Sequence, residues 1–146
     1  MSDKLTENLN RHLANWLVFA MKLRHCHWYV TGPHFFTLHA KFGELYAEAD
    51  RYADEVAERI LALGGRPVST MQACLSQAVV AEAVQGWTAE AMVGAVLEDL
   101  RQLALEMRQL AGEAEGAGDV TTHDLVASML NRTEKEMWML GAFLGR

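Results

Sequence analysis

The chain has 146 residues, of which 51% are hydrophobic and only two are Pro, and its formal net charge is −6. This composition excludes a disordered chain and suffices for the core of one domain, which we expect to span residues 1–146. The acidic balance argues against a surface that attracts the phosphates of nucleic acids.

Four long stretches rich in Ala, Leu, Glu and Met are separated by breaks that contain Gly or Pro, and this pattern predicts an all-α fold. The predicted helices run from Asp3 to Tyr29, from His34 to Leu63, from Thr88 to Glu115, and from Thr121 or Thr122 to Leu144. Within each helix, hydrophobic residues recur at intervals of three and four, which indicates one buried stripe. The stripes contain Leu9, Leu13, Trp16, Ala20 and Leu23; Leu38, Phe42, Leu45, Ala49, Tyr52 and Val56; Val93, Val96, Leu100, Leu103, Met107 and Leu110; and Val126, Leu130, Thr133, Met137, Leu140 and Leu144.

The second predicted helix carries an additional, adjacent stripe. Its members are Phe35, His39, Phe42, Tyr46, Ala49 and Ala53. A face this broad exceeds what a bundle within one chain needs, so we expect the helix to pack on a second molecule as well.

The connection between the second and third long helices is too long for a simple bundle loop. We expect a short helix from Thr70 to about Glu82, with Ser69 as its N-cap. Four long helices with one long crossover predict a ferritin-like four-helix bundle with a short extra helix in that crossover.

The two cysteines, Cys26 and Cys74, are isolated in hydrophobic helical contexts, so we interpret both as buried thiols in a reducing compartment. The first ten residues are polar, unlike a signal peptide, and no run of about 18 apolar residues exists that could span a membrane. We therefore expect a cytoplasmic protein.

Residues that ligate metals are concentrated around the predicted turn between the first two helices. Four of the six histidines lie there, namely His25, His27, His34 and His39. Further along the second helix, Asp50, Asp54 and Glu58 recur every four residues, which places three carboxylates along one helical face.

Like charges at this spacing repel each other unless something neutralises them. One interpretation is ordinary surface pairing, of Arg51 with Asp54 and of Glu55 with Arg59. The other is a bound cation, because carboxylate and imidazole ligands together suit Fe(II), Mn(II) or Zn(II).

A single helix cannot bring His39 and Asp54 to one ion. They are fifteen residues apart, which is roughly 22 Å along a helix, whereas direct ligands lie about 2 Å from a metal. Two antiparallel copies of the helix about a two-fold axis would bring His39 of one chain beside Asp54 of the other, and His27 could join them across the turn.

Ferritins and related di-iron bundles carry Glu-x-x-His motifs on two core helices. No histidine here has Glu three residues before it, so we expect no di-iron centre of that kind within one chain. The four other histidines are interpreted as packing or surface residues. They are His12, His25, His34 and His123.

The segment HWYVTGPHFFTLHAKF, followed by ADEVAERILALGGRP, resembles the signature of the Dps family, the mini-ferritins also called DNA-binding proteins from starved cells. The final stretch, DVTTHDLVASMLNRTEKEMWMLGAFLG, is similar to the last helix of that family. The resemblance covers nearly the whole chain, so we expect residues 1–146 to form a single Dps domain.

The resemblance implies a dodecamer that encloses a cavity, with ferroxidase sites at two-fold interfaces between subunits. It assigns the metal ligands to His27 and His39 of one chain and to Asp54 and Glu58 of its neighbour. It implies an enzyme that oxidises Fe(II) with hydrogen peroxide and stores the ferric iron, protecting the cell from oxidative damage. Trp28 matches a family tryptophan that passes electrons or quenches radicals; plain packing is the alternative.

The sequence departs from the family pattern at Gly43, where an acidic residue often follows the second histidine by four positions. A second iron in each site is therefore expected to be held weakly or through water. The family's acidic pores map to Asp119 and Asp124, although Asp near a helix N-terminus is also favoured by the helix dipole.

Three functions compete. The first is the ferroxidase and iron store described above. The second is a Dps-fold shell that coats DNA or a surface. The acidic charge and the lack of a basic tail argue against it, because Lys4 is the only base in the short N-terminal extension. The third is a structural helical oligomer whose site holds Zn(II) or nothing.

Overall fold

The computed structural model describes residues 3–146, so the first two residues of the polar N-terminal segment lie outside the described residues. The described chain is all helical, with four long helices and one short one, and the predicted fold class is confirmed. The helices are α1 (Asp3–Tyr29), α2 (Phe35–Ala62), α3 (Met71–Gln77), α4 (Ala89–Gly116) and α5 (Val120–Phe143).

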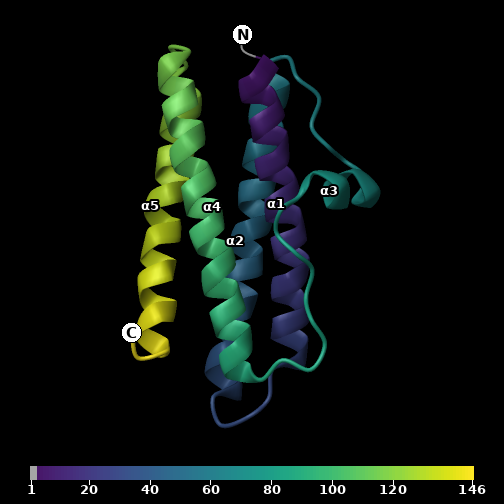
Figure 1. The fold of residues 1–146 in the computed structure, drawn as a ribbon, viewed down its shortest axis with the longest axis vertical. Helices are drawn as coiled ribbons and strands as arrows, with labels where there is room; N and C mark the ends of the chain where they lie inside the picture. The colour runs from purple at the N-terminus through teal and green to yellow at the C-terminus, as the bar shows by residue number, and fades with distance from the viewer. Residues whose placement is uncertain (1–2) are drawn as a thin grey trace.

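The long helices form two antiparallel pairs, α1 with α2 and α4 with α5 (Figure 1). Because α2 ends at the top of the bundle and α4 begins at the bottom, the connection between them travels the length of the molecule. The short helix α3 lies in this crossover and rests against α1. This is the predicted ferritin-like topology.

The predicted stripes form the core. Every stripe residue of the first three long helices is less than 9% exposed, and the stripe of α5 is buried or half-buried. Both cysteines are buried, as predicted. Burial raises the pKa of the Cys26 thiol to about 12, so this thiol stays protonated at neutral pH.

One predicted N-cap is wrong, and the last helix starts one residue earlier than the nearer of the two predicted positions. The N-cap of α3 is Thr70 and not Ser69, because the Thr70 hydroxyl accepts a hydrogen bond from the Ala73 amide. The last helix begins at Val120, with Asp119 as its N-cap, and not at Thr121 or Thr122. The N-cap predicted for α4, Thr88, is confirmed by the bond from the Ala91 amide.

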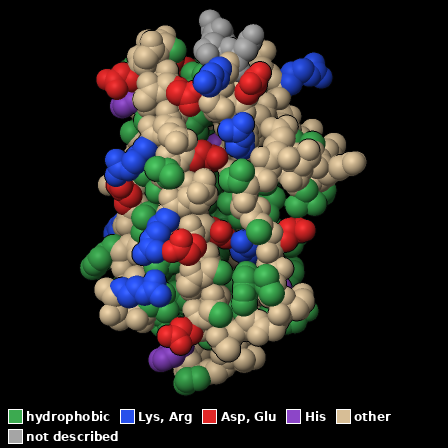
Figure 2. All heavy atoms as spheres, in the orientation of Figure 1, with side chains coloured by type: hydrophobic (Ala, Val, Ile, Leu, Met, Phe, Trp, Pro, Cys, Tyr) green, Lys and Arg blue, Asp and Glu red, His purple; other side chains and the backbone are tan. Residues whose placement is uncertain are grey.

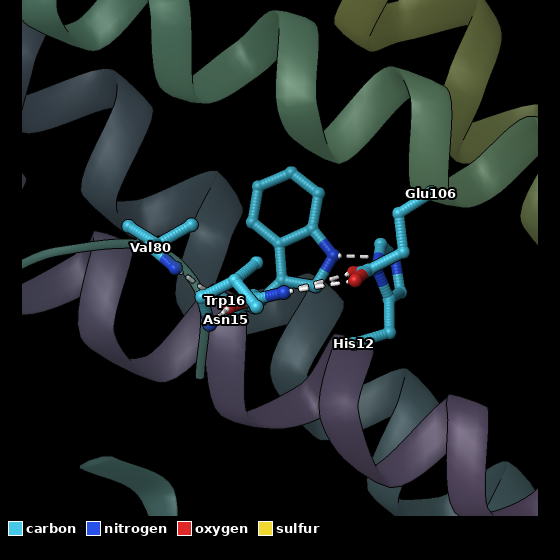
Figure 3. A network of polar contacts seen from close by, with 6 residues as sticks. His12, Asn15, Trp16, Val80 and Glu106 are labelled. Atoms are coloured by element: carbon cyan, nitrogen blue, oxygen red, sulfur yellow. Dashed lines mark hydrogen bonds and ion pairs between the residues drawn. The ribbon is translucent and has the colours of Figure 1, made fainter. Parts of the chain in front are cut away.

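A buried polar network connects α1 with α4 (Figure 3). The Trp16 indole donates to His12 Nε2 at 2.8 Å, so the neutral imidazole carries its hydrogen on Nδ1, which lies 2.5 Å from Glu106 Oε1. Asn15 donates to both carboxylate oxygens of Glu106. His12 and Asn15 are completely buried, and their hydrogen bonds compensate the cost of burying the Glu106 carboxylate.

Asn15 also fixes the crossover to the bundle. Its side-chain carbonyl accepts hydrogen bonds from the amides of Val79 and Val80, at 2.8 and 3.1 Å. Asn10, further up α1, accepts one from the Val68 amide in the same way. These bonds satisfy backbone groups in a connection that has little secondary structure of its own.

Replacing Asn15 by Ala should therefore destabilise the protein by about 2–4 kcal/mol, because the two amides lose their partner and the buried Glu106 carboxylate keeps only its bond to His12. Chemical denaturation measures this loss, and proteolysis within residues 78–81 should accelerate. Asn8→Ala is the matched control, since Asn8 makes a single half-buried bond to Glu113. Equal effects of the two substitutions would contradict the role given to Asn15.

Asp119 joins the start of α5 to the end of α2. Its carboxylate accepts hydrogen bonds from the Thr122 amide and hydroxyl and lies 3.0 Å from the Arg59 guanidinium. Burial alone would raise the pKa of Asp119, but the bonds from Thr122 and the charge of Arg59 outweigh it and hold this pKa below its usual 3.8.

Asp119→Ala should cost about 1–2 kcal/mol at neutral pH, as loss of an N-cap does. Asp119→Asn, which keeps a capping oxygen but loses the charge, should cost less. Because folding lowers the pKa of Asp119, its charge stabilises the protein above the carboxyl's ordinary pKa, and this contribution fades as the pH falls through the lowered value. Thermal unfolding from neutral to strongly acidic pH should thus show the wild type and Asp119→Asn converging; a constant gap would contradict the ion pair.

The surface combines charges of both signs with exposed hydrophobic side chains, which gather over α3 and the segment that follows it (Figure 2). Met71 and Leu75 on α3 are 79% and 49% exposed, and Trp28 at the end of α1 is 65% exposed. Among the described helices, none is both long and apolar enough to cross a membrane.

Candidate metal centre

Two of the predicted ligands meet where α1 turns into α2. His27 lies in the last turn of α1 and His39 lies near the start of α2, and the chain reverses between them at Gly32, whose φ of +110° favours glycine. The two imidazole rings stack, with centroids 3.7 Å apart and planes 14° from parallel. Both residues are half-buried.

Each imidazole bonds to the backbone of the other histidine. His27 Nδ1 lies 2.5 Å from the His39 carbonyl oxygen, and His39 Nδ1 lies 2.7 Å from the His27 carbonyl oxygen. A carbonyl only accepts, so both Nδ1 atoms carry a hydrogen and donate it. The His27 carbonyl is one of the last in α1, which have no partner within the helix.

These bonds determine which nitrogen of each imidazole is free to ligate a metal. With hydrogen on Nδ1, each neutral imidazole presents an unprotonated Nε2, the atom that would ligate a metal. A bond from the other ring nitrogen to a backbone carbonyl is also the support that orients metal-binding histidines in proteins. The pair thus offers two oriented nitrogen ligands.

Aromatic and charged groups hold the pair in place. Tyr46 meets His27 edge-on at 5.4 Å, and Phe35 stacks on His39 at 5.0 Å. The Arg24 guanidinium lies 4.3 Å above the Tyr46 ring and makes two bonds to the Asp50 carboxylate. The sequence pattern placed Tyr46 on the same stripe as His39 but gave it no part in the site. It did not single out Arg24, whose neighbours depend on the packing of α1 against α2.

The three predicted carboxylates differ in whether a basic side chain pairs with them. Asp50 is engaged by Arg24, at 2.5 Å between Nη2 and Oδ2. Asp54 and Glu58 are exposed, and within the described chain neither makes a hydrogen bond or an ion pair. Two carboxylates on one helical face therefore point into solvent without a counter-charge from their own chain.

Both surface pairs suggested by the sequence are wrong. Arg51 lies 3.6 Å from Glu48, one turn back along the helix, and does not pair with Asp54. Arg59 reaches Asp119 and Thr122 instead of Glu55.

One chain brings together the two histidines but not all four predicted ligands. Asp54 is fifteen residues beyond His39 on the same helix, or roughly 22 Å away. Within the described residues, no three metal-ligating side chains gather into a site. Within one chain, the two imidazoles and the two exposed carboxylates form separate halves of the predicted metal site.

Gly43 lies one turn beyond His39 in α2. It is the position at which the sequence departs from the family pattern. A Cβ at this position would lie 3.1 Å from His27 Cε1 and 3.2 Å from His27 Nδ1. Position 43 thus faces the imidazole pair, and this chain places no carboxylate there.

The two pore candidates differ. The Asp119 carboxylate is engaged in the cap of α5 and in the pair with Arg59, and its side chain is only 16% exposed. Asp124 is 75% exposed, with His123 Nδ1 at 3.4 Å. Asp119 therefore holds the fold, and Asp124 is the carboxylate accessible to a cation.

The comparisons with known proteins identify the class of this fold. The family model for the ferritin-like domain matches residues 6–146, and the chain belongs to that family. It is 44% identical to DNA protection during starvation protein 2 of Bacillus anthracis and 46% identical to general stress protein 20U of Bacillus subtilis, over at least 99% of each chain.

Within the ferritin-like family, the chain belongs to the Dps proteins. It superimposes on the crystal structure of Dps from Staphylococcus aureus with a TM-score of 0.96 at 43% identity, covering 98% of this chain and 96% of that one. The predicted resemblance is therefore confirmed. Membership implies a part in iron storage and in protection against stress.

Proposed function

We propose that this protein stores and detoxifies iron as a ferroxidase: it binds Fe(II), oxidises it with hydrogen peroxide and holds the ferric product inside a hollow dodecamer. The observation that carries the proposal is the reciprocal bonding of His27 and His39, which leaves both Nε2 atoms open and oriented. Imidazole nitrogen and carboxylate oxygen together suit Fe(II).

A second chain supplies the missing half of the site in this proposal. If two α2 helices pack antiparallel about a two-fold axis, Asp54 and Glu58 of the second chain lie beside His27 and His39 of the first. Each dimer then contains two identical sites. The two carboxylates neutralise the charge of the incoming Fe(II), and the cation relieves their mutual repulsion.

Exposed hydrophobic residues near the ligands support such a contact. A groove of about 810 Å³ lies between α1 and α3, and it is lined by Met21, Trp28, Met71 and Leu75 together with Arg24 and Asp50. Monomeric proteins rarely leave such surface uncovered. A second copy of the chain covers it in the dimer that we propose, so packing between subunits accounts for Trp28.

The chemistry divides between the iron and the protein. Two Fe(II) ions give up one electron each, the O–O bond of one hydrogen peroxide breaks, and two protons complete two water molecules. The His27 and His39 nitrogens bind the ferrous ion, whereas the harder ferric ion prefers oxygen ligands and leaves for acidic surface inside the shell. Exposed carboxylates such as Asp124 line the entry path.

Replacing His39 or Asp54 by Ala should reduce the rate of Fe(II) oxidation by peroxide about tenfold or more while the shell still assembles. The rate is followed by absorbance of the ferric product and the assembly by light scattering. Glu55→Ala is the matched control, because Glu55 neighbours Asp54 but points about 100° away around the helix. Unchanged oxidation rates in both ligand variants would contradict the ferroxidase proposal and favour the structural helical oligomer.

Storage has its own test. After anaerobic Fe(II) loading and stoichiometric peroxide, size-exclusion chromatography with light scattering and iron detection should show soluble ferric iron eluting with a particle of roughly twelve chains. A monomer or dimer with precipitated iron would contradict storage.

DNA coating is the alternative that the relatives' names raise. The net charge of −6 opposes direct binding to phosphates. We expect no DNA retardation in a gel shift at low salt, where electrostatic binding is strongest, and a shift that disappears with added salt would favour the alternative.

A further inference from the structure

A positively charged residue lies close to the histidine half of the site. Arg24 is three residues before His27 on α1, and its guanidinium lies 4.3 Å above the Tyr46 ring, which in turn meets the His27 ring edge-on at 5.4 Å. Salt screens this charge incompletely, because the Arg24 side chain is only 28% exposed. A divalent cation that approaches the open Nε2 atom of His27 is therefore repelled by Arg24.

Packing keeps the guanidinium in this position. A guanidinium over the face of an aromatic ring is attracted by the electrons of the ring, which here belongs to Tyr46. Arg24 also donates a hydrogen bond to the Ala20 carbonyl, one turn back along α1. Arg24 thus contributes to the packing of α1 against α2, but it brings positive charge to a place where a cation should bind.

Asp50 is the counter-ion of this charge. Its Oδ2 atom lies 2.5 Å from Arg24 Nη2 and its Oδ1 atom lies 3.3 Å from Nη1, so both oxygens face the guanidinium. Asp50 stands one turn before Asp54 on α2, so the pair lies close to the carboxylate half of the site as well. The pair has no net charge, and a cation at the site experiences little of the charge of Arg24.

We infer that Asp50 strengthens the binding of a divalent cation without ligating it: its carboxylate cancels the charge that Arg24 brings beside His27. Asp50 acts through Arg24, so it is a positioning residue and differs in role from the proposed ligands Asp54 and Glu58. This role accounts for a row of three acids in which only two are proposed as ligands. The inference rests on the proposed function, because it concerns the metal that this function requires.

Binding of Co(II), followed by its visible absorption under anaerobic conditions at low ionic strength, tests the inference without any oxidation of iron. Asp50→Asn keeps the shape of the side chain and should weaken Co(II) binding about fivefold, because the charge of Arg24 is then uncompensated. Added salt should reduce this loss, because salt screens charges. Asp50→Glu, which retains the negative charge, should bind Co(II) about as tightly as the wild type.

Removing both charges distinguishes charge compensation from ligation. Arg24→Gln should bind Co(II) more tightly than the wild type, and the double variant Arg24→Gln/Asp50→Asn should return to the wild-type affinity. If Asp50 were a ligand, the double variant would stay as weak as Asp50→Asn. Glu134→Gln is the matched control, because it makes the same change in net charge and breaks the ion pair with Arg108 between α4 and α5. It should leave the Co(II) affinity unchanged.

Light scattering establishes whether each variant assembles as the wild type does. If Asp50→Asn does not assemble, Arg24→Gln decides the question, and an affinity no tighter than that of the wild type would overturn the inference. With intact assembly, equal affinities of Asp50→Asn and the wild type, or a double variant as weak as Asp50→Asn, would overturn the inference and leave the proposed function standing. A wild type that binds no Co(II) would overturn both.

Discussion

The rigidity of one long helix is the constraint on which the rest of this structure depends. Helix α2 carries His39 near one end and Asp54 and Glu58 in its second half, and an α-helix keeps such positions roughly 22 Å apart. Neither half is a metal site alone, and no folding of a single chain brings them together. A second α2 lying antiparallel to the first would account both for the exposed hydrophobic groove beside α1 and for the two carboxylates that have no partner among the described residues.

Within the histidine half of the site, backbone carbonyls orient the two imidazole rings. His27 and His39 each donate from Nδ1 to the other's carbonyl, so the turn between α1 and α2 and the two imidazoles hold each other in place. The open Nε2 atoms follow from this bonding and need no further residue. Arg24 pairs with Asp50, the first of the three acids in the row. The other two, Asp54 and Glu58, have no partner among the residues that the structure describes.

The periodic stripes predicted the helices and the core because burial on one helical face repeats every three to four residues, as the buried side chains of α1, α2 and α4 confirm. Features that depend on distant neighbours could not be predicted in this way. Asp119, Thr121 and Thr122 are all residue types that favour an N-cap, and the sequence alone does not choose between them. In the structure the cap is Asp119, which also pairs with Arg59, sixty residues earlier in the chain. Arg51 had carboxylates one turn away in both directions and takes Glu48. The stacking of His27 on His39 depends on the three-dimensional path of the turn between α1 and α2, which the sequence pattern does not give.

The central claim, that each site is shared by two chains, is tested most directly by complementation. One variant carries His27→Ala and His39→Ala, and the other carries Asp54→Ala and Glu58→Ala; each alone should be inactive in Fe(II) oxidation. When the two are unfolded, mixed in equal amounts and refolded together, half of the dimers are mixed, and each mixed dimer has one intact site. Activity should therefore return to about a quarter of the wild-type value. Activity that stays at the level of the separate variants in mixed shells would contradict a shared site and require all ligands to come from one chain.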